Sequence, residues 1–113
     1  MVHNRNKLID LFIGNAANAV THRILEKAID DEDIAKKYIQ EIRNSWDIAQ
    51  KYRQKINPVN TPLQHKDAEE IKKRIVVKVK SELLLRISKG YQNIDLTLVN
   101  TFVDDALKEL DVC

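Results

Sequence analysis

A polar stripe near the amino terminus holds the residues with the most chemical potential in this sequence. Asn15, Asn18, His22 and Glu26 follow one another at three- and four-residue spacing, so they share one face of a helix. An imidazole four residues before a carboxylate could supply two ligands to a metal ion, and the imidazole alone could carry a phosphoryl group. The same spacing is typical of the solvent face of an amphipathic helix, which is the arrangement we expect for this stripe.

His22 on a small helical chain resembles the histidine phosphotransfer domains in size and architecture alone. Those domains place a Lys-Gly pair shortly after the histidine, whereas residues 23–26 here read Arg-Ile-Leu-Glu. Because a shared architecture does not imply a shared activity, we do not assign phosphotransfer activity to His22 from this resemblance. The sequence also has no Glu-x-x-His pair, and its acidic run at 30–33 lacks the glycine of a calcium loop. We therefore expect no catalytic residue, no metal site and no cofactor.

Four blocks of helix-spaced apolar residues organise the chain around this stripe. They predict helices at about 6–29, 31–56, 62–89 and 95–110. Helices joined by short connections pack as antiparallel neighbours. The sequence therefore predicts an all-α, antiparallel up-and-down four-helix bundle, formed as a single domain by residues 1–113.

Capping signals support these boundaries. The acidic run Asp30–Asp33 offers an N-cap to the second helix, and Asp95 offers one to the fourth. Residues 57–60, Asn-Pro-Val-Asn, predict a loop, and residues 61–64, Thr-Pro-Leu-Gln, are typical of a capping box. Gly90 suits a left-handed C-cap, with the next side chain packing back on the helix.

One segment favours an alternative fold. Residues 74–80 are rich in β-branched side chains and nearly alternate between polar and apolar. A small α+β fold with a hairpin within 74–99 is therefore the second candidate. We prefer helix here because the capping signals at both ends of the block agree with it.

Apolar residues cover more of the third block than one bundle interior can bury. Ile71, Ile75, Val79, Leu83 and Ile87 form one ridge, and further apolar residues lie off it. In the second block, Trp46 flanks a regular contact face. Burial on two sides predicts self-association, with a homodimer as the expected state. The candidate interface residues are Trp46, Val76, Val77, Leu84 and Leu85.

The middle of the chain is basic. Residues 51–90 hold 11 Lys and Arg against 4 Asp and Glu, between two segments of net negative charge. A basic helix can neutralise phosphates along a nucleic-acid backbone, although Glu69, Glu70 and Glu82 dilute this one. The segment can also be neutralised within the fold or by a second copy of the chain. The candidate nucleic-acid contacts are Lys66, Lys72, Lys73, Arg74, Lys78 and Lys80.

Composition points to a cytoplasmic protein. Cys113 is the only cysteine, which suits a reducing compartment, and no apolar run is long enough to span a bilayer. The function that the sequence favours is that of a small, non-enzymatic and self-associating interaction module that binds a protein partner. A small basic nucleic-acid-binding protein ranks second. A phosphotransfer or metal-binding bundle that uses His22 ranks third.

Overall fold

The chain folds as an all-α four-helix bundle, as the sequence predicts. The computed structural model describes residues 5–56 and 63–112. Within these ranges it contains no strand, and residues 74–80, the strongest strand candidate, lie inside a helix. The predicted loop at 57–60, the capping residues Thr61 and Pro62, and Cys113 lie outside the described ranges. The four helices are α1 (Arg5–Ala28), α2 (Glu32–Ile56), α3 (His65–Ser88) and α4 (Leu98–Glu109).

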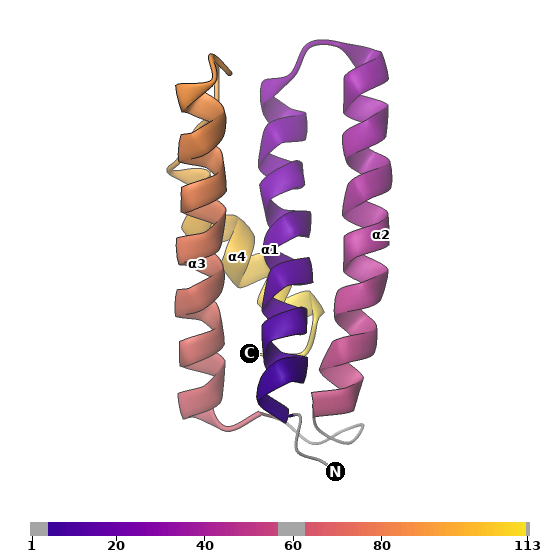
Figure 1. Cartoon of the computed structure of the whole chain (residues 1–113), viewed down its shortest axis with the longest axis vertical. Helices are drawn as coiled ribbons and strands as arrows, with labels where there is room; N and C mark the ends of the chain where they lie inside the picture. Colours follow the sequence, from indigo (N-terminus) through magenta and orange to yellow (C-terminus); the bar gives the residue numbers. More distant parts are fainter. Residues whose placement is uncertain (1–4, 57–62, 113) are drawn as a thin grey trace.

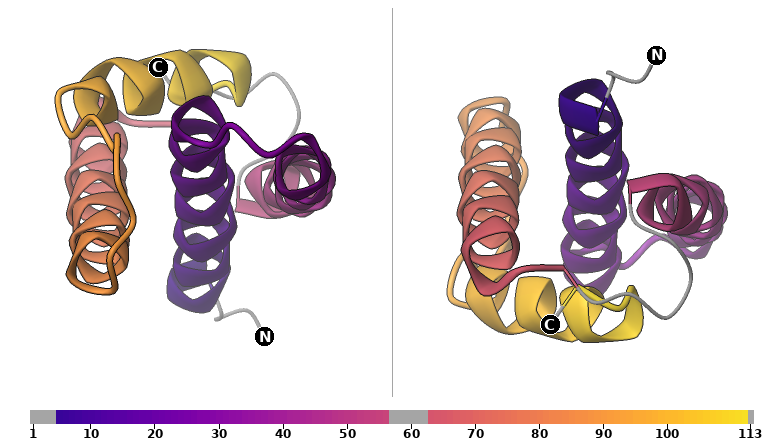
Figure 2. Two further views of the ribbon diagram at one scale, coloured as in Figure 1. Left: turned by 90° about the horizontal axis from the view of Figure 1, so that it is seen from above. Right: turned by 90° about the horizontal axis from the view of Figure 1, so that it is seen from below.

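The helix α1 occupies the middle of the bundle. The three long helices lie side by side in the order α3, α1, α2, and α4 lies across α1 and α3 on one side of them (Figures 1 and 2). Cα atoms of α1 come within 8 Å of all three other helices, and α3 also meets α4. Among the described residues, no Cα atom of α2 comes within 8 Å of α3 or α4. The expected adjacency of α2 and α3 is therefore not found, because α1 lies between them.

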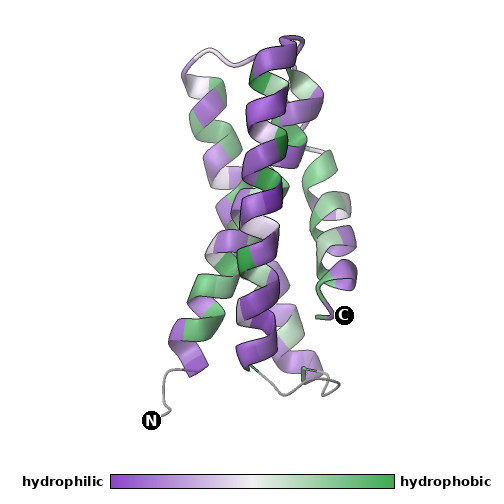
Figure 3. Cartoon of the chain, turned by 90° about the vertical axis from the view of Figure 1, so that its right-hand side faces the viewer, coloured by the Kyte–Doolittle hydropathy of each residue, from purple (hydrophilic) through white to green (hydrophobic). Residues whose placement is uncertain are grey.

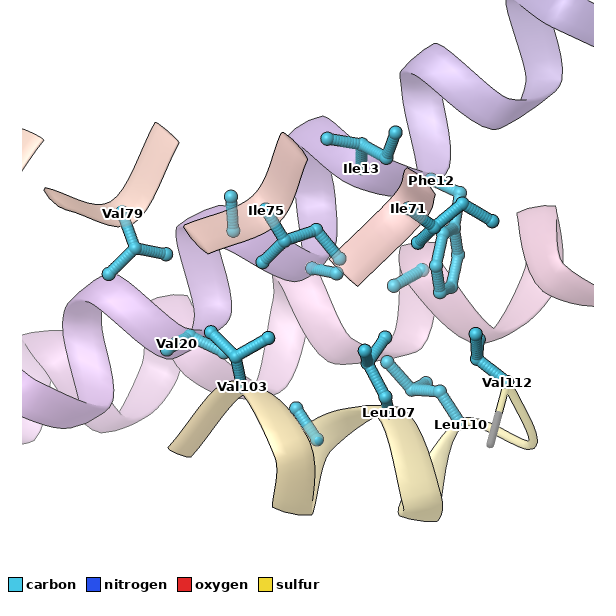
Figure 4. Close-up of a cluster of buried hydrophobic side chains, with 14 of the residues drawn as sticks. Phe12, Ile13, Val20, Ile71, Ile75, Val79, Val103, Leu107, Leu110 and Val112 are labelled. Atoms are coloured by element: carbon cyan, nitrogen blue, oxygen red, sulfur yellow. The ribbon is translucent and has the colours of Figure 1, made fainter. Parts of the chain in front are cut away.

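The main core forms where α1, α3 and α4 converge. Figure 4 shows Phe12 and Val20 of α1 facing the ridge of α3 and the inner side of α4. The ridge residues of α3 are almost fully buried except for the last, Ile87, which is 39% exposed. Removing such side chains from water is the main favourable contribution to folding. The large side chains that are fully buried here are Phe12, Ile13, Ile24, Leu25, Ile71, Ile75, Leu83 and Leu107.

The helix α2 packs on α1 through a narrow face. Ser45, Ala49 and Ile56 are buried on this face, and Tyr38 and Tyr52 are partly buried against the core. Its opposite face is mainly hydrophilic (Figure 3). Arg53 is also buried, and its Nε donates a hydrogen bond to the carbonyl oxygen of Asp111 at 3.0 Å. This side chain connects α2 to the segment that follows α4.

The helix starts agree with the sequence in part. The Asp31 carboxylate accepts hydrogen bonds from the backbone N–H groups of Asp33 and Ile34, so the predicted N-cap of α2 is confirmed. At α3, Gln64 is the N-cap residue and makes no side-chain cap bond. Asp95 lies three residues before α4 and accepts hydrogen bonds from Thr97, which hold the pKa of its carboxyl below the usual range. It therefore stabilises the turn that leads into α4 rather than the first turn of the helix.

Two helices end in the same hydrogen-bonded motif. After α3, the N–H of Tyr91 bonds to the carbonyl of Arg86 and the N–H of Gly90 to that of Ile87. This is a Schellman motif, and Gly90 takes its left-handed position with φ of 100°. The predicted C-cap is therefore confirmed. After α4, Val112 and Asp111 repeat the pattern, with Asp111 at φ of 62°.

Replacement of Gly90 tests this cap. A Cβ atom at this position would meet no heavy atom within 4 Å, so only the backbone conformation opposes a side chain. We expect Gly90→Ala to lower the free energy of unfolding by about 1 kcal/mol and Gly90→Asn to lower it less, because Asn tolerates the left-handed region. Urea unfolding with an unchanged m-value measures both. An alanine variant as stable as the wild type would contradict the assignment.

Candidate interaction surface

Two residues of the predicted polar stripe of α1, Asn18 and His22, contact α2. His22 is 9% exposed, and Asn18 donates a hydrogen bond from Nδ2 to Ser45 Oγ at 2.6 Å. Asn15 bonds to the backbone carbonyl of Leu11 in its own helix. The expectation of a solvent face is therefore wrong for His22, which is buried against α2, whereas Asn15, Asn18 and Glu26 are only partly buried.

The stripe continues into a group of aromatic side chains. The ring of His22 meets that of Tyr38 edge-on, with centroids 5.4 Å apart. Tyr91 lies beside Tyr38, and its hydroxyl receives a hydrogen bond from Arg86 at 3.5 Å. Burial, followed by the interaction with Tyr91, raises the pKa of the Tyr38 hydroxyl above its ordinary value of 10.0. These contacts connect α1, α2 and the segment after α3.

His22 is held in one orientation by this environment. Its Nδ1 lies 2.8 Å from the carbonyl oxygen of Asn18, so Nδ1 carries the hydrogen that this carbonyl accepts. No group of three or more metal-ligating side chains occurs in the described parts of the chain, and Glu26 makes no recorded contact with His22. The geometry gives the stripe a structural role in the α1–α2 contact.

The candidate nucleic-acid contacts do not gather on one surface. Lys72 pairs with Asp104 of α4 at 2.7 Å, and Arg74 pairs with Asp10 of α1 at 2.6 Å. Part of the basic segment is thus neutralised by the acidic flanks of the chain. Lys66, Lys73 and Lys80 are exposed and recur every seven residues, so they share the side of α3 that points away from the core. Lys78 lies on another side of the helix, beside α1.

The candidate interface residues divide into two groups. Trp46 is partly buried, and the guanidinium of Arg23 lies over its ring, 4.4 Å from the centroid. Val76 is also partly buried against the core. By contrast, three apolar residues of α3 project from the bundle: Val77 is 59% exposed, Leu84 53% and Leu85 48%. The predicted excess of apolar surface on this helix is therefore present at these three positions.

Ser81 lies among these exposed residues, and the sequence interpretation missed it. It follows Val77 and precedes Leu85 at four-residue steps, and it is itself exposed. The sequence pattern that could have indicated Ser81 is a small side chain between two larger apolar residues at four-residue spacing. We call Val77, Ser81, Leu84 and Leu85 the α3 outer face.

Comparisons with known protein families, with curated proteins and with solved structures found no match for this chain. No helix in the described part of the chain is long and apolar enough to cross a bilayer. The surfaces described above are therefore the basis for any functional argument.

Removal of the Tyr38 hydroxyl tests the polar contacts between helices. We expect Tyr38→Phe to lower the free energy of unfolding by about 1 kcal/mol at neutral pH, because it removes the interaction of a partly buried hydroxyl with Tyr91. The pKa is raised in the folded state, so this contribution is complete below pH 10.0 and is lost as the pH rises through the folded-state pKa. Denaturant unfolding at several pH values should show the difference between variant and wild type shrinking above pH 10.0.

Tyr52→Phe is the matched control for this measurement. Tyr52 is also partly buried on the inner side of α2, but its hydroxyl makes no hydrogen bond within the residues described. Its removal should leave the stability unchanged within about 0.5 kcal/mol. Equal losses of stability in the two variants would show that the interaction between Tyr38 and Tyr91 contributes nothing specific.

Proposed function

We propose that this protein is a small non-enzymatic interaction module that associates through the α3 outer face. One observation carries the proposal: Val77, Leu84 and Leu85 are each about half exposed or more, and they lie together on one helix. Clustered apolar side chains on a surface commonly mark a protein interface, because their burial is favourable by about 25 cal/mol per Å².

The charges around these residues suit a protein partner better than a nucleic acid. Lys73, Lys78, Lys80 and Glu82 lie beside the apolar side chains, so both signs are present at the face. Interfaces commonly place an apolar centre inside a charged and polar rim. A phosphate backbone would meet a carboxylate at the same place, and two of the six candidate cations are already paired within the fold.

Nucleic-acid binding remains the second candidate for one reason. Lys66, Lys73 and Lys80 are exposed on one side of α3 and form no ion pair within the described residues. Three cations along one helix can contact phosphates without any base recognition.

Introduction of a charge at the α3 outer face tests the proposed function. We expect the wild type to sediment as a dimer at micromolar concentration, and Val77→Glu or Leu84→Glu to sediment as folded monomers, because a carboxylate cannot be buried there unpaired. Sedimentation equilibrium gives the masses and circular dichroism checks the fold. Ile39→Glu is the control, since Ile39 is 44% exposed on α2 and should leave the dimer intact. A wild type that remains monomeric at high micromolar concentration would contradict the proposal.

A triple substitution separates the two candidate functions. If α3 bound nucleic acid, replacing Lys66, Lys73 and Lys80 with Gln would weaken binding to all sequences and reduce the salt dependence by up to about three phosphate contacts. We expect no appreciable binding of single- or double-stranded probes near physiological salt by fluorescence anisotropy. Tight binding that the triple variant loses would reverse our ranking. A control variant with Gln at Lys7, Lys37 and Lys51 removes the same charge elsewhere.

A further inference from the structure

A shallow groove runs between α1 and α3 beside the α3 outer face. Gly14 and Ala17 of α1 form its floor, and Val77, Ser81 and Leu85 form the α3 side, with a volume of about 420 Å³. A Cβ atom added at Gly14 would meet nothing within 4 Å, so the floor is open. Small residues on both sides leave room for another helix to approach closely.

We infer that the occupant of this groove is α3 of a second copy of the chain, running antiparallel and crossing at Ser81. This inference rests on the proposed function and adds the partner and the register. Val77 and Leu85 lie one turn on either side of Ser81. A two-fold axis at Ser81 therefore brings Val77 of each copy beside Leu84 and Leu85 of the other. The small serine side chain lies where the two helices are closest.

Charge complementarity is the argument for a second copy. Lys78 and Glu82 lie on the same edge of the groove, three residues before Ser81 and one residue after it. Neither forms an ion pair within the described residues. In an antiparallel pair the same edges of the two helices lie together. Lys78 of one copy then lies about 3 Å along the axis from Glu82 of the other, and the contact is made twice.

A parallel pair of α3 helices does not have this complementarity. In that arrangement Lys78 would lie at the level of the second Lys78, and Glu82 at that of the second Glu82. Like charges at close range oppose association. At the edge that carries Lys78 and Glu82, the charges therefore favour the antiparallel arrangement.

Cysteine cross-linking tests the register. In a Cys113→Ser background, Ser81→Cys should form a covalent dimer with a short thiol cross-linker at concentrations where the protein associates. Ser88→Cys is the matched control, because Ser88 lies on the same side of α3. In the antiparallel pair its two copies lie about 21 Å apart along the axis, whereas a parallel pair would bring them together. Cross-linking at 88, or none at 81, would overturn the inference.

Charge reversal provides a second and independent test. Lys78→Glu or Glu82→Lys alone should weaken the dimer about tenfold, because each change places like charges together at two symmetric contacts. The double variant should return to within about threefold of the wild type, since it restores opposite charges in exchanged positions. Both residues are exposed, so all three variants should remain folded.

The outcomes separate this inference from the proposed function. One outcome is that Val77→Glu disrupts a dimer that neither cross-links at position 81 nor recovers in the double variant. That result would support the proposed function and overturn the antiparallel register. A wild type without self-association overturns both. Cross-linking at 81 with recovery in the double variant establishes the second copy as the occupant of the groove.

Discussion

The fold depends on α1, which lies between α2 and α3 and also contacts α4. This one helix must pack against α3 and α4 with apolar side chains such as Phe12 and Ile24, and against α2 with Asn18 and His22. Three sides of α1 are therefore covered by other helices, and small residues are buried among the contacts. Ala16 and Ala19 are at most 1% exposed. The surfaces of α2 and α3 that α1 does not cover determine what the bundle presents to a partner.

The two outer helices meet this constraint in different ways. On α2 a narrow contact face is joined to α1 by the Asn18–Ser45 hydrogen bond, and the free face is mainly hydrophilic, with the isolated side chains Ile34, Ile39 and Ile48 at 37%, 44% and 40% exposure. On α3 the ridge toward the core is apolar, but apolar residues continue onto the free side at Val77, Leu84 and Leu85. Polar side chains on the free side of α2 are hydrated at little cost in free energy. The apolar side chains on the free side of α3 remain in contact with water unless a partner covers them. This difference places the proposed function on α3.

Local features of the fold could be predicted from the sequence, and the arrangement of helices could not. The caps at Asp31 and Gly90 depend on neighbouring residues alone, so the sequence indicates them directly. The placement of α2 and α3 on opposite sides of α1 depends on long-range packing, which helical periodicity does not specify. The stripe at Asn18 and His22 looked solvent-facing because a polar pattern does not reveal a polar partner such as Ser45. The exposed residues of α3 were predicted because this helix has more apolar residues than one core can bury. The role proposed for Ser81 follows only from the groove, which the sequence does not reveal.

Residue-resolved hydrogen exchange at low and high protein concentration tests the central claim, that α1 holds the fold together and leaves α3 for a partner. The amides of α1 between Phe12 and Leu25 should exchange most slowly at both concentrations, because their opening requires separation from three helices. Those of α3 between Val77 and Leu85 should slow as the concentration rises, while those of α2 should not change. Amides of α2 as slow as those of α1, or an α3 unaffected by concentration, would contradict this account.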